Sequence, residues 1–337
     1  MKAYILDRYA RKAVLRLGEL PEPALRENDV LIEVHAAGLN LLDSKIRDGE
    51  FKAILPYRPP LVLGHDVAGK VVRVGSGARR FKLGDAVYAR PRDGRIGTFA
   101  EFIAVDEADA APKPVNLTME EAAGLPLVAL TAWQVLVERA GLSPGQKVLI
   151  HAGSGGVGVF AIQLAKHLGA AVATTASAAN AELVRSLGAD VVIDYRTQDF
   201  ARELSGYDVV LNSLDGETLE RSLNVLKPGG KLISISGPPD PAFAKAQGLN
   251  PILKLIIGLL SRKIRHKAAA KGIDYSFLFM RAGGEQLRRI TALIEAGDIR
   301  PVLDRTFAFA DLNAALAYLE TGRAKGKVVV TLKEDAQ

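Results

Sequence analysis

Four glycines lie within seven residues near the middle of the chain, in Ala152-Gly153-Ser154-Gly155-Gly156-Val157-Gly158. An apolar run typical of a strand precedes them over residues 147–151, and a helical pattern follows over residues 157–168. Glycines at these positions permit a tight turn, a close approach of the backbone to an anion, and close packing of helix on strand. Free N–H groups and the helix dipole then favour a phosphate. A purely structural turn is the alternative, but the strand and helix around it favour a dinucleotide site.

The end of the next strand indicates which dinucleotide is bound. An NAD site usually carries Asp or Glu about 20 residues past the glycines, where it binds the ribose 2′-hydroxyl. Residues 174–180 read Thr-Thr-Ala-Ser-Ala-Ala-Asn and contain no acid. Ser177 can donate a hydrogen bond to a 2′-phosphate, and Tyr195 and Arg196 can cover its edge. The sequence therefore predicts NADPH. In the alternative, Ser177 only caps the helix that begins at Asn180, and Tyr195 is a surface aromatic.

The composition excludes several other kinds of chemistry. The 337 residues include no cysteine, which removes disulfides, thiolate metal sites and cysteine nucleophiles, and favours a reducing compartment, the cytoplasm. Residues 1–11 lack the pattern of a signal peptide. The longest apolar stretch, residues 251–260, is broken by Lys254 and is far shorter than the roughly 20 residues that cross a bilayer. We expect no membrane span.

The order of the expected elements predicts an α/β protein with two domains, as its length also favours. Short Val- and Ile-rich runs separated by Gly and Pro predict an antiparallel, partly barrel-like β domain over the first 120 residues. From about Glu120, apolar strands alternate with helical patterns, which predicts a doubly wound parallel sheet with helices on both faces. The strands expected in this second part span residues 147–151, 171–175, 191–194, 207–211 and 230–235.

Residues 238–272 interrupt the βα rhythm, and we expect an insertion or lid there. An apolar run at residues 251–260 is followed by five cations within residues 262–271. This composition suits an amphipathic helix that contacts a membrane surface peripherally. The interpretation we favour is a packed lid or subunit contact with a solvated cationic end.

Several motifs together resemble those of the medium-chain dehydrogenase/reductases. They are residues 64–75 (GHDVAGKVVRVG), 84–88 (GDAVY), 152–158 and 226–231 (LKPGGK). Residues 37–43, 130–133, 193–195 and 322–327 are similar to the zinc-free quinone oxidoreductase and alkenal (enone) reductase branch. The resemblance implies a GroES-like catalytic domain over residues 1–122 and 282–337, and a Rossmann nucleotide-binding domain over residues 123–281. It also implies a homodimer and an NADPH-dependent reduction of quinones or of the C=C bond of 2-alkenals and enones.

The resemblance bears on metal binding too. Zinc alcohol dehydrogenases of the same superfamily have a cysteine ligand where this chain has Asn40 and a histidine ligand where it has His65. Without a thiolate, a tetrahedral zinc would lack most of its ligands, so we expect no metal and a hydrogen-bonded structural role for His65. Reducing an activated C=C bond or a quinone needs less electrophilic help than oxidising an alcohol, because the substrate's own carbonyl accepts the electrons.

The family positions suggest roles for further residues. Asn40 either donates a hydrogen bond to the substrate or the cofactor amide, or caps the helix over residues 41–47. Thr131 either contacts the cofactor or bonds its own helix. Lys327 resembles a carboxyl-terminal cation near the phosphates or nicotinamide. Residues expected to line the cofactor cleft at strand ends are Asn212, Ser213, Leu214, Ser236 and Gly237. Candidates for an apolar substrate wall, or for simple core, are Phe51, Tyr57, Trp133 and Tyr275.

Two other functions compete with this prediction. One is a zinc-independent alcohol-type dehydrogenase on the same fold. The other is a non-catalytic NADPH-binding or RNA-binding regulator, with which the net charge of +6 is compatible. The sequence has no aromatic and basic strand motif of the kind that binds single-stranded RNA, so a nucleic-acid partner is not expected.

Overall fold

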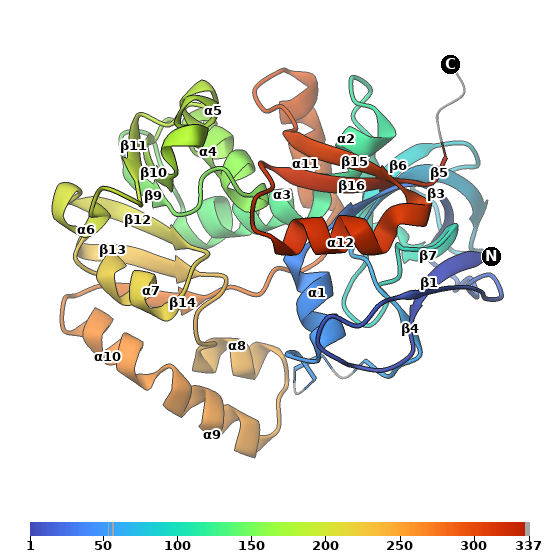
Figure 1. The fold of residues 1–337 in the computed structure, drawn as a ribbon, viewed down its shortest axis with the longest axis horizontal. Coiled ribbons are helices and arrows are strands. Elements are labelled where there is room, and N and C mark those ends of the chain that lie inside the picture. Colours follow the sequence, from blue (N-terminus) through green and yellow to red (C-terminus); the bar gives the residue numbers. More distant parts are fainter. Residues whose placement is uncertain (53, 56, 334–337) are drawn as a thin grey trace. The chain divides into compact units, whose positions relative to one another are not determined.

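The computed structural model describes residues 1–52, 54–55 and 57–333, and the chain divides into two compact units. Unit 1 comprises Met1–Leu130 and Arg281–Gln337, and unit 2 comprises Thr131–Met280. Figure 1 labels their elements. We still propose domain boundaries near residues 122 and 282, as the sequence indicated, whereas the two compact units meet at residues 130/131 and 280/281. The predicted α/β class is confirmed, with a mixed sheet in unit 1 and a parallel sheet in unit 2.

The larger sheet of unit 1 is built around one long strand, β3. In spatial order its path is β15 (Leu303–Ala308), β16 (Lys327–Thr331), β3 (Asp29–Leu39), β5 (Asp66–Val74), β6 (Ala86–Ala89) and β8 (Ala110–Pro112), and β7 (Phe102–Asp106) also pairs with β3. Neighbours are antiparallel except β15 and β16. Both faces of β3 are buried, which explains why apolar residues occupy adjacent positions at Val30, Leu31 and Ile32.

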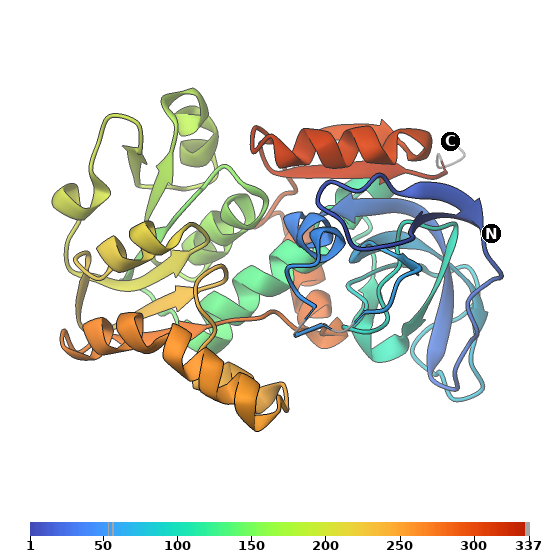
Figure 2. The ribbon, with the colours of Figure 1, turned by 60° about the horizontal axis from the view of Figure 1, so that its bottom comes forward.

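The described residues of unit 1 also form a smaller antiparallel sheet and the α-helices named below. The small sheet runs β2 (Arg16–Glu19), β1 (Lys2–Leu6), β4 (Leu61–Val62). The helices are α1 (Leu41–Asp48), α2 (Met119–Ala123), α11 (Gly284–Glu295) and α12 (Leu312–Glu320). Helix α12 runs alongside β16 (Figures 1 and 2). Because β16 lies between β15 and β3, the carboxyl-terminal part of the chain completes the sheet that the amino-terminal part begins.

Unit 2 is a six-stranded parallel sheet. Its order is β11 (Val191–Asp194), β10 (Ala171–Ala176), β9 (Lys147–Ile150), β12 (Tyr207–Asn212), β13 (Leu226–Ser234) and β14 (Asp274–Phe277). Helices α4 (Gly156–His167) and α5 (Ala181–Ser186) cover one face, and α7 (Gly216–Ser222) and α10 (Arg262–Ala269) cover the other (Figure 1). From β9 the chain adds strands first on one side, as β10 and β11, and then on the other, as β12, β13 and β14. Doubly wound folds bind their ligands at this change of side, between β9 and β12.

The remaining elements join these parts. Helix α3 (Pro126–Trp133) continues into a π-helical turn at Gln134–Ala140, and α6 (Phe200–Glu203) precedes β12. The predicted insertion over residues 238–272 ends with α10, which follows α8 (Pro241–Ala246) and α9 (Pro251–Leu260). Asp240 and Asn250 cap α8 and α9 through their side chains. Among the described residues, no helix is long and apolar enough to cross a membrane.

Candidate active site

The glycine-rich turn joins β9 to α4, and its glycines are needed where a side chain would collide. A Cβ on Gly158 would lie 2.4 Å from the carbonyl oxygen of Ala152, and one on Gly153 would lie 2.0 Å from Thr174 Oγ1. The left-handed backbone conformation in this turn falls on Ala152, with φ of 52°, and not on Gly153. Gly153 is thus required by its contact with β10 rather than by its own turn geometry.

The first turn of α4 directs unpaired N–H groups out of this loop. Gly155 is the N-cap, and Gly156, Val157 and Gly158 form the first turn, whose N–H groups have no acceptor within the helix. Ser154 Oγ accepts a hydrogen bond of 3.0 Å from Asn180 Nδ2. Within the described part of the chain, Asn180 Oδ1 is buried and has no hydrogen-bond partner. Asn180 was expected only as the start of a helix, and this unpaired oxygen is not visible in the sequence.

The ends of β10 and β11 carry the residues expected near the 2′ position of the cofactor. The two strands run in register, with Ala176 opposite Asp194, so Ser177 and Tyr195 follow neighbouring strand ends. Ser177 is buried, and its hydroxyl makes no capping bond to the short turn Ala178–Asn180. Tyr195 is 59% exposed, and the Arg196 guanidinium lies 5.9 Å from the centre of its ring.

Asn212, at the end of β12, holds the next strand end through its side chain. Its Oδ1 accepts a hydrogen bond from Ser234 Oγ (3.1 Å) and lies 3.4 Å from Ser236 Oγ. Its Nδ2 is fully buried and unpaired among the described residues. Ser213 Oγ donates to the carbonyl of His151, and Ser236 Oγ donates to that of Leu214.

The backbone N–H of Gly237 donates to Ser234 Oγ, which ties the loop after β13 to the same strand end. Unpaired polar atoms are costly to bury, so the amide of Asn212 and the oxygen of Asn180 point to a polar ligand at this edge of the sheet. Together with the glycine turn, these residues fit a nicotinamide dinucleotide.

In unit 1, the structure brings Asn40 and Lys327 together around a buried carboxylate. Lys327 Nζ donates to Leu39 O (2.9 Å), Asn40 Oδ1 (2.5 Å) and Asp66 Oδ2 (3.2 Å). Asn40 Nδ2 donates to Asp66 Oδ2 at 2.9 Å. Asp66 Oδ1 accepts from the N–H of Leu127. Three acceptors therefore use all three ammonium protons of Lys327.

Burial raises the pKa of Asp66 above its usual range, while Lys327, Asn40 and the N–H of Leu127 oppose that rise. Asp66 stands in the motif over residues 64–75, but the sequence assigned it no role. Asp66 and Lys327 are 261 residues apart in the sequence, so no local sequence pattern indicates their contact.

A second carboxylate fixes the backbone and the histidine beside Asn40. Asp43 Oδ2 accepts from the N–H of Asn40 (2.9 Å), while Oδ1 accepts from the N–H of Gly64 (3.1 Å) and lies 2.6 Å from His65 Nδ1. Asp43 and His65 are fully buried. Asn40 does occupy the N-cap of α1, but its side chain bonds Asp66 and Lys327.

The donor set around Asn40 does not suit zinc. The Asn40 oxygen accepts a hydrogen bond from the Lys327 ammonium, whose positive charge would repel a metal ion at this position. No group of three or more His, Cys, Asp or Glu side chains in the described residues is arranged to hold a metal ion. The fixed positive charge next to Asn40 is that of Lys327.

The four aromatic residues expected to line the substrate lie in both units. Phe51 and Tyr57 are half-buried in unit 1, and Trp133 is half-buried at the end of α3. Burial raises the pKa of Tyr57 to about 12, and its hydroxyl accepts from the N–H of Gly94. Tyr275 lies in the hydrophobic core of unit 2, and its hydroxyl donates to the carbonyl of Pro238, which matches the alternative of a core residue. Thr131 is buried on α3.

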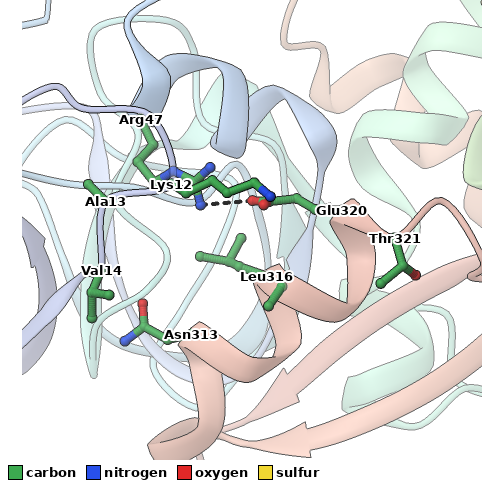
Figure 3. A pocket seen from close by; sticks show the side chains of 9 residues that line it. Lys12, Ala13, Val14, Arg47, Asn313, Leu316, Glu320 and Thr321 are labelled. Carbon is green, nitrogen blue, oxygen red and sulfur yellow. Dashed lines mark ion pairs between the residues drawn. The ribbon is translucent and has the colours of Figure 1, made fainter.

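Unit 1 also contains a pocket of about 300 Å³ between α1 and α12 (Figure 3). Arg47 and Glu320 face one another there at 2.8 Å, and Arg47 also pairs with Asp48. None of the predicted site residues lines this pocket. It is lined by Lys12, Ala13, Val14, Arg47, Asn313, Leu316, Ala317, Glu320 and Thr321.

Comparisons with known proteins agree with the fold. The family model of the alcohol dehydrogenase GroES-like domain matches residues 26–115, and that of the zinc-binding dehydrogenases matches residues 187–330. A GroES-like domain followed by a doubly wound sheet with a glycine-rich turn defines a nicotinamide-dependent dehydrogenase or reductase.

Relatives with full-length similarity narrow this class. The chain is 35% identical over 361 residues to a mitochondrial NAD(P)H oxidoreductase of Danio rerio, covering 99% of the chain and 92% of the relative. It is 38% identical over 341 residues to the chloroplastic NADPH-dependent alkenal/one oxidoreductase of Arabidopsis thaliana, covering 98% and 79%. The solved quinone oxidoreductase of Coxiella burnetii is 31% identical and superposes with a TM-score of 0.86 over 99% of both chains. The chain belongs to the medium-chain dehydrogenase/reductase superfamily, in its quinone oxidoreductase and enone reductase branch, and is a nicotinamide-dependent oxidoreductase.

Proposed function

We propose that this enzyme uses NADPH to reduce quinones or the C=C bond of α,β-unsaturated carbonyl compounds, without zinc. The observation that carries the proposal is the orientation of the Asn40 carboxamide. Lys327 Nζ bonds its oxygen and Asp66 accepts from its nitrogen, so the two ends of the amide are distinguished.

The amide nitrogen of Asn40 has one N–H to spare. Its first N–H is used by Asp66, and its second makes a contact of 3.5 Å to the carbonyl of Gly38, which is long for a hydrogen bond. We propose that this second N–H donates to the carbonyl oxygen of the substrate, where negative charge develops during reduction. When bound, the reduced nicotinamide supplies the hydride.

Lys327 supports this role through charge. Its ammonium lies 2.5 Å from Asn40 Oδ1, so it polarises the amide and makes the N–H a better donor. When the substrate already carries an electron-accepting carbonyl, one polarised N–H donor is enough to stabilise the negative charge that develops on the carbonyl oxygen. We therefore expect turnover to survive treatment with a zinc chelator, and loss of activity that added zinc restores would contradict the proposal.

NADPH is the proposed cofactor because of the strand ends in unit 2. The Ser177 hydroxyl is not used in a helix cap, and the Arg196 guanidinium lies near the ring of the exposed Tyr195. A serine donor and a nearby guanidinium suit a 2′-phosphate. The name of the Arabidopsis relative, which specifies NADPH, also supports this preference. The Ser177→Glu variant should lose the preference for NADPH over NADH, because a carboxylate repels the phosphate.

The test is a panel of quinones, 2-alkenals, cyclic enones and simple ketones, assayed with NADPH and with NADH. We expect turnover of the first three classes with NADPH, and a kcat for the Asn40→Leu variant lower by about 10²-fold. Turnover of simple ketones alone would favour an alcohol-type dehydrogenase. NADPH binding without turnover of any class would favour a regulatory protein.

The resemblance also supports a homodimer, and the lack of cysteine suits a reducing compartment such as the cytoplasm. Light scattering coupled to size-exclusion chromatography tests the first of these proposals, and cell fractionation tests the second.

A further inference from the structure

Helix α9 presents an apolar stripe to solvent. Ile252, Leu255 and Leu259 are 71%, 66% and 59% exposed, and Ile256 and Leu260 are exposed beside them. Their spacing of three and four residues places all five on one face of the helix. Helix α9 packs against α8 and α10, and Ile257 is its buried residue. Scattered exposed apolar residues are ordinary, but five on one helical face form a contiguous patch, which differs from the packed lid expected from the sequence.

Helix α10 continues this exposed face with cations. Ser261 ends α9 and begins α10 in a right-handed helical conformation, so the phase of the helix is roughly kept. Figures 1 and 2 show the two helices following one another along the edge of unit 2. Ile264 and Ala268 are buried against the unit, while Lys263 and Lys267 lie on the exposed side. The outward face is therefore apolar along α9 and cationic along α10.

The positive charge of the protein is concentrated in this segment. Residues 241–273 contain seven Lys and Arg and no Asp or Glu. Because the whole chain carries +6 and this segment +7, the rest of the chain carries −1. Glu220 of α7 pairs with Lys263 and Lys267. In the described part of the chain, Arg262, at the start of α10, forms no ion pair.

We propose that α9 and α10 form a docking surface for an anionic lipid bilayer, with α9 inserted among the headgroups and α10 bound to their phosphates. An exposed apolar face next to cations is the composition that binds such a surface. A second copy of the chain would bring the same seven cations to the contact, with no acid in the segment to pair with them. A polyanion such as nucleic acid would leave the apolar stripe exposed to water.

The experiment is co-sedimentation of the purified full-length protein with vesicles. The protein should sediment with vesicles that contain phosphatidylglycerol, much less with pure phosphatidylcholine, and less as salt is added. The Leu255→Ser/Leu259→Ser variant should lose about ten-fold or more in vesicle affinity. Its matched control, Leu83→Ser/Val115→Ser, removes two exposed apolar side chains elsewhere and should bind as the wild type does.

A second pair of variants tests the role of charge. We compare the vesicle affinity of Arg262→Gln/Lys263→Gln with that of Arg11→Gln/Arg26→Gln, which removes two exposed cations of unit 1. A selective loss in the first variant supports the proposal. Failure of the wild type to sediment with anionic vesicles at low salt would overturn it, as would equal losses in test and control variants. If light scattering shows that Leu255→Ser/Leu259→Ser breaks an oligomer while the wild type ignores vesicles, the patch is a contact between copies. None of these readouts depends on turnover.

Discussion

The contact between Lys327 and Asp66 is the feature whose removal should be most informative. Both side chains are almost fully buried, and their charged atoms lie 3.2 Å apart. At an effective dielectric constant of about 20, two unit charges at this distance attract by about 5 kcal/mol. Replacing Lys327 with Met removes that attraction and leaves a carboxylate in the interior. Breaking a buried ion pair on one side costs about 3 to 5 kcal/mol.

The assay is urea unfolding of four proteins: wild type, Lys327→Met, Asp66→Asn, and the double variant. We expect Lys327→Met to lose about 3 to 5 kcal/mol in the free energy of unfolding. The double variant should regain a large part of that loss, because it buries no unpaired charge. Lys325→Met, which removes an exposed cation two residues away, should stay within about 0.5 kcal/mol of the wild type.

Kinetics of the double variant separate stability from orientation. If Lys327 and Asp66 serve to orient the Asn40 amide, the double variant folds but its kcat falls by about ten-fold or more, with KM changed much less. A Lys327→Met protein as stable as the wild type would refute the electrostatic reasoning. A stable double variant with full kcat would refute the role in orienting Asn40.

Two further predictions concern unit 2. Gly158→Ala should abolish NADPH binding or folding, because its Cβ would lie 2.4 Å from the carbonyl oxygen of Ala152. A Cβ on Gly155 would lie 3.3 Å from the same atom, so Gly155→Ala should bind NADPH within about ten-fold of the wild type. Isothermal titration measures the binding and circular dichroism measures the folding of both variants, and equal effects would contradict the packing argument. Burial lowers the pKa of His151 from 6.5 to about 4, so the folded state binds fewer protons than the unfolded state between these values. Above about pH 6.5 His151 is neutral in both states and does not lower the free energy of unfolding. As the pH drops towards 4, the unfolded state takes up the proton first, and the free energy of unfolding falls by about 3 kcal/mol. Unfolding measured at several pH values should show a flatter profile for His151→Asn, and parallel profiles would count against the prediction.

Much of the parallel sheet could be predicted from the sequence because its strands are local features. The predicted bounds of β11 agree with the structure, and those of β9, β10 and β12 each differ from it by one residue at the carboxyl end. Among the described strands, those that the sequence did not reveal are β1, β2, β4, β8 and β15. In β15, Asp304, Arg305 and Thr306 are polar because the strand lies at the edge of its sheet, so it lacks an apolar run.

The site shows a similar division between local and distant information. The glycine turn was visible because its residues are adjacent and its neighbours are a strand and a helix. Asp66 and Asp43 received no role because their partners depend on how distant segments meet. A buried carboxylate is recognisable only once its donors are placed.

The cost of burying Lys327 and Asp66 is itself an argument about function. Apolar residues of similar volume can stabilise a core as well as a buried ion pair does, so stability alone does not explain why charges occupy this position. What an apolar pair cannot do is tell the two ends of a carboxamide apart. An ammonium on Asn40 Oδ1 and a carboxylate on Nδ2 fix which end of the amide is the donor. A reductase that stabilises negative charge on a substrate oxygen needs an N–H at that position, and a carbonyl oxygen there would repel the charge.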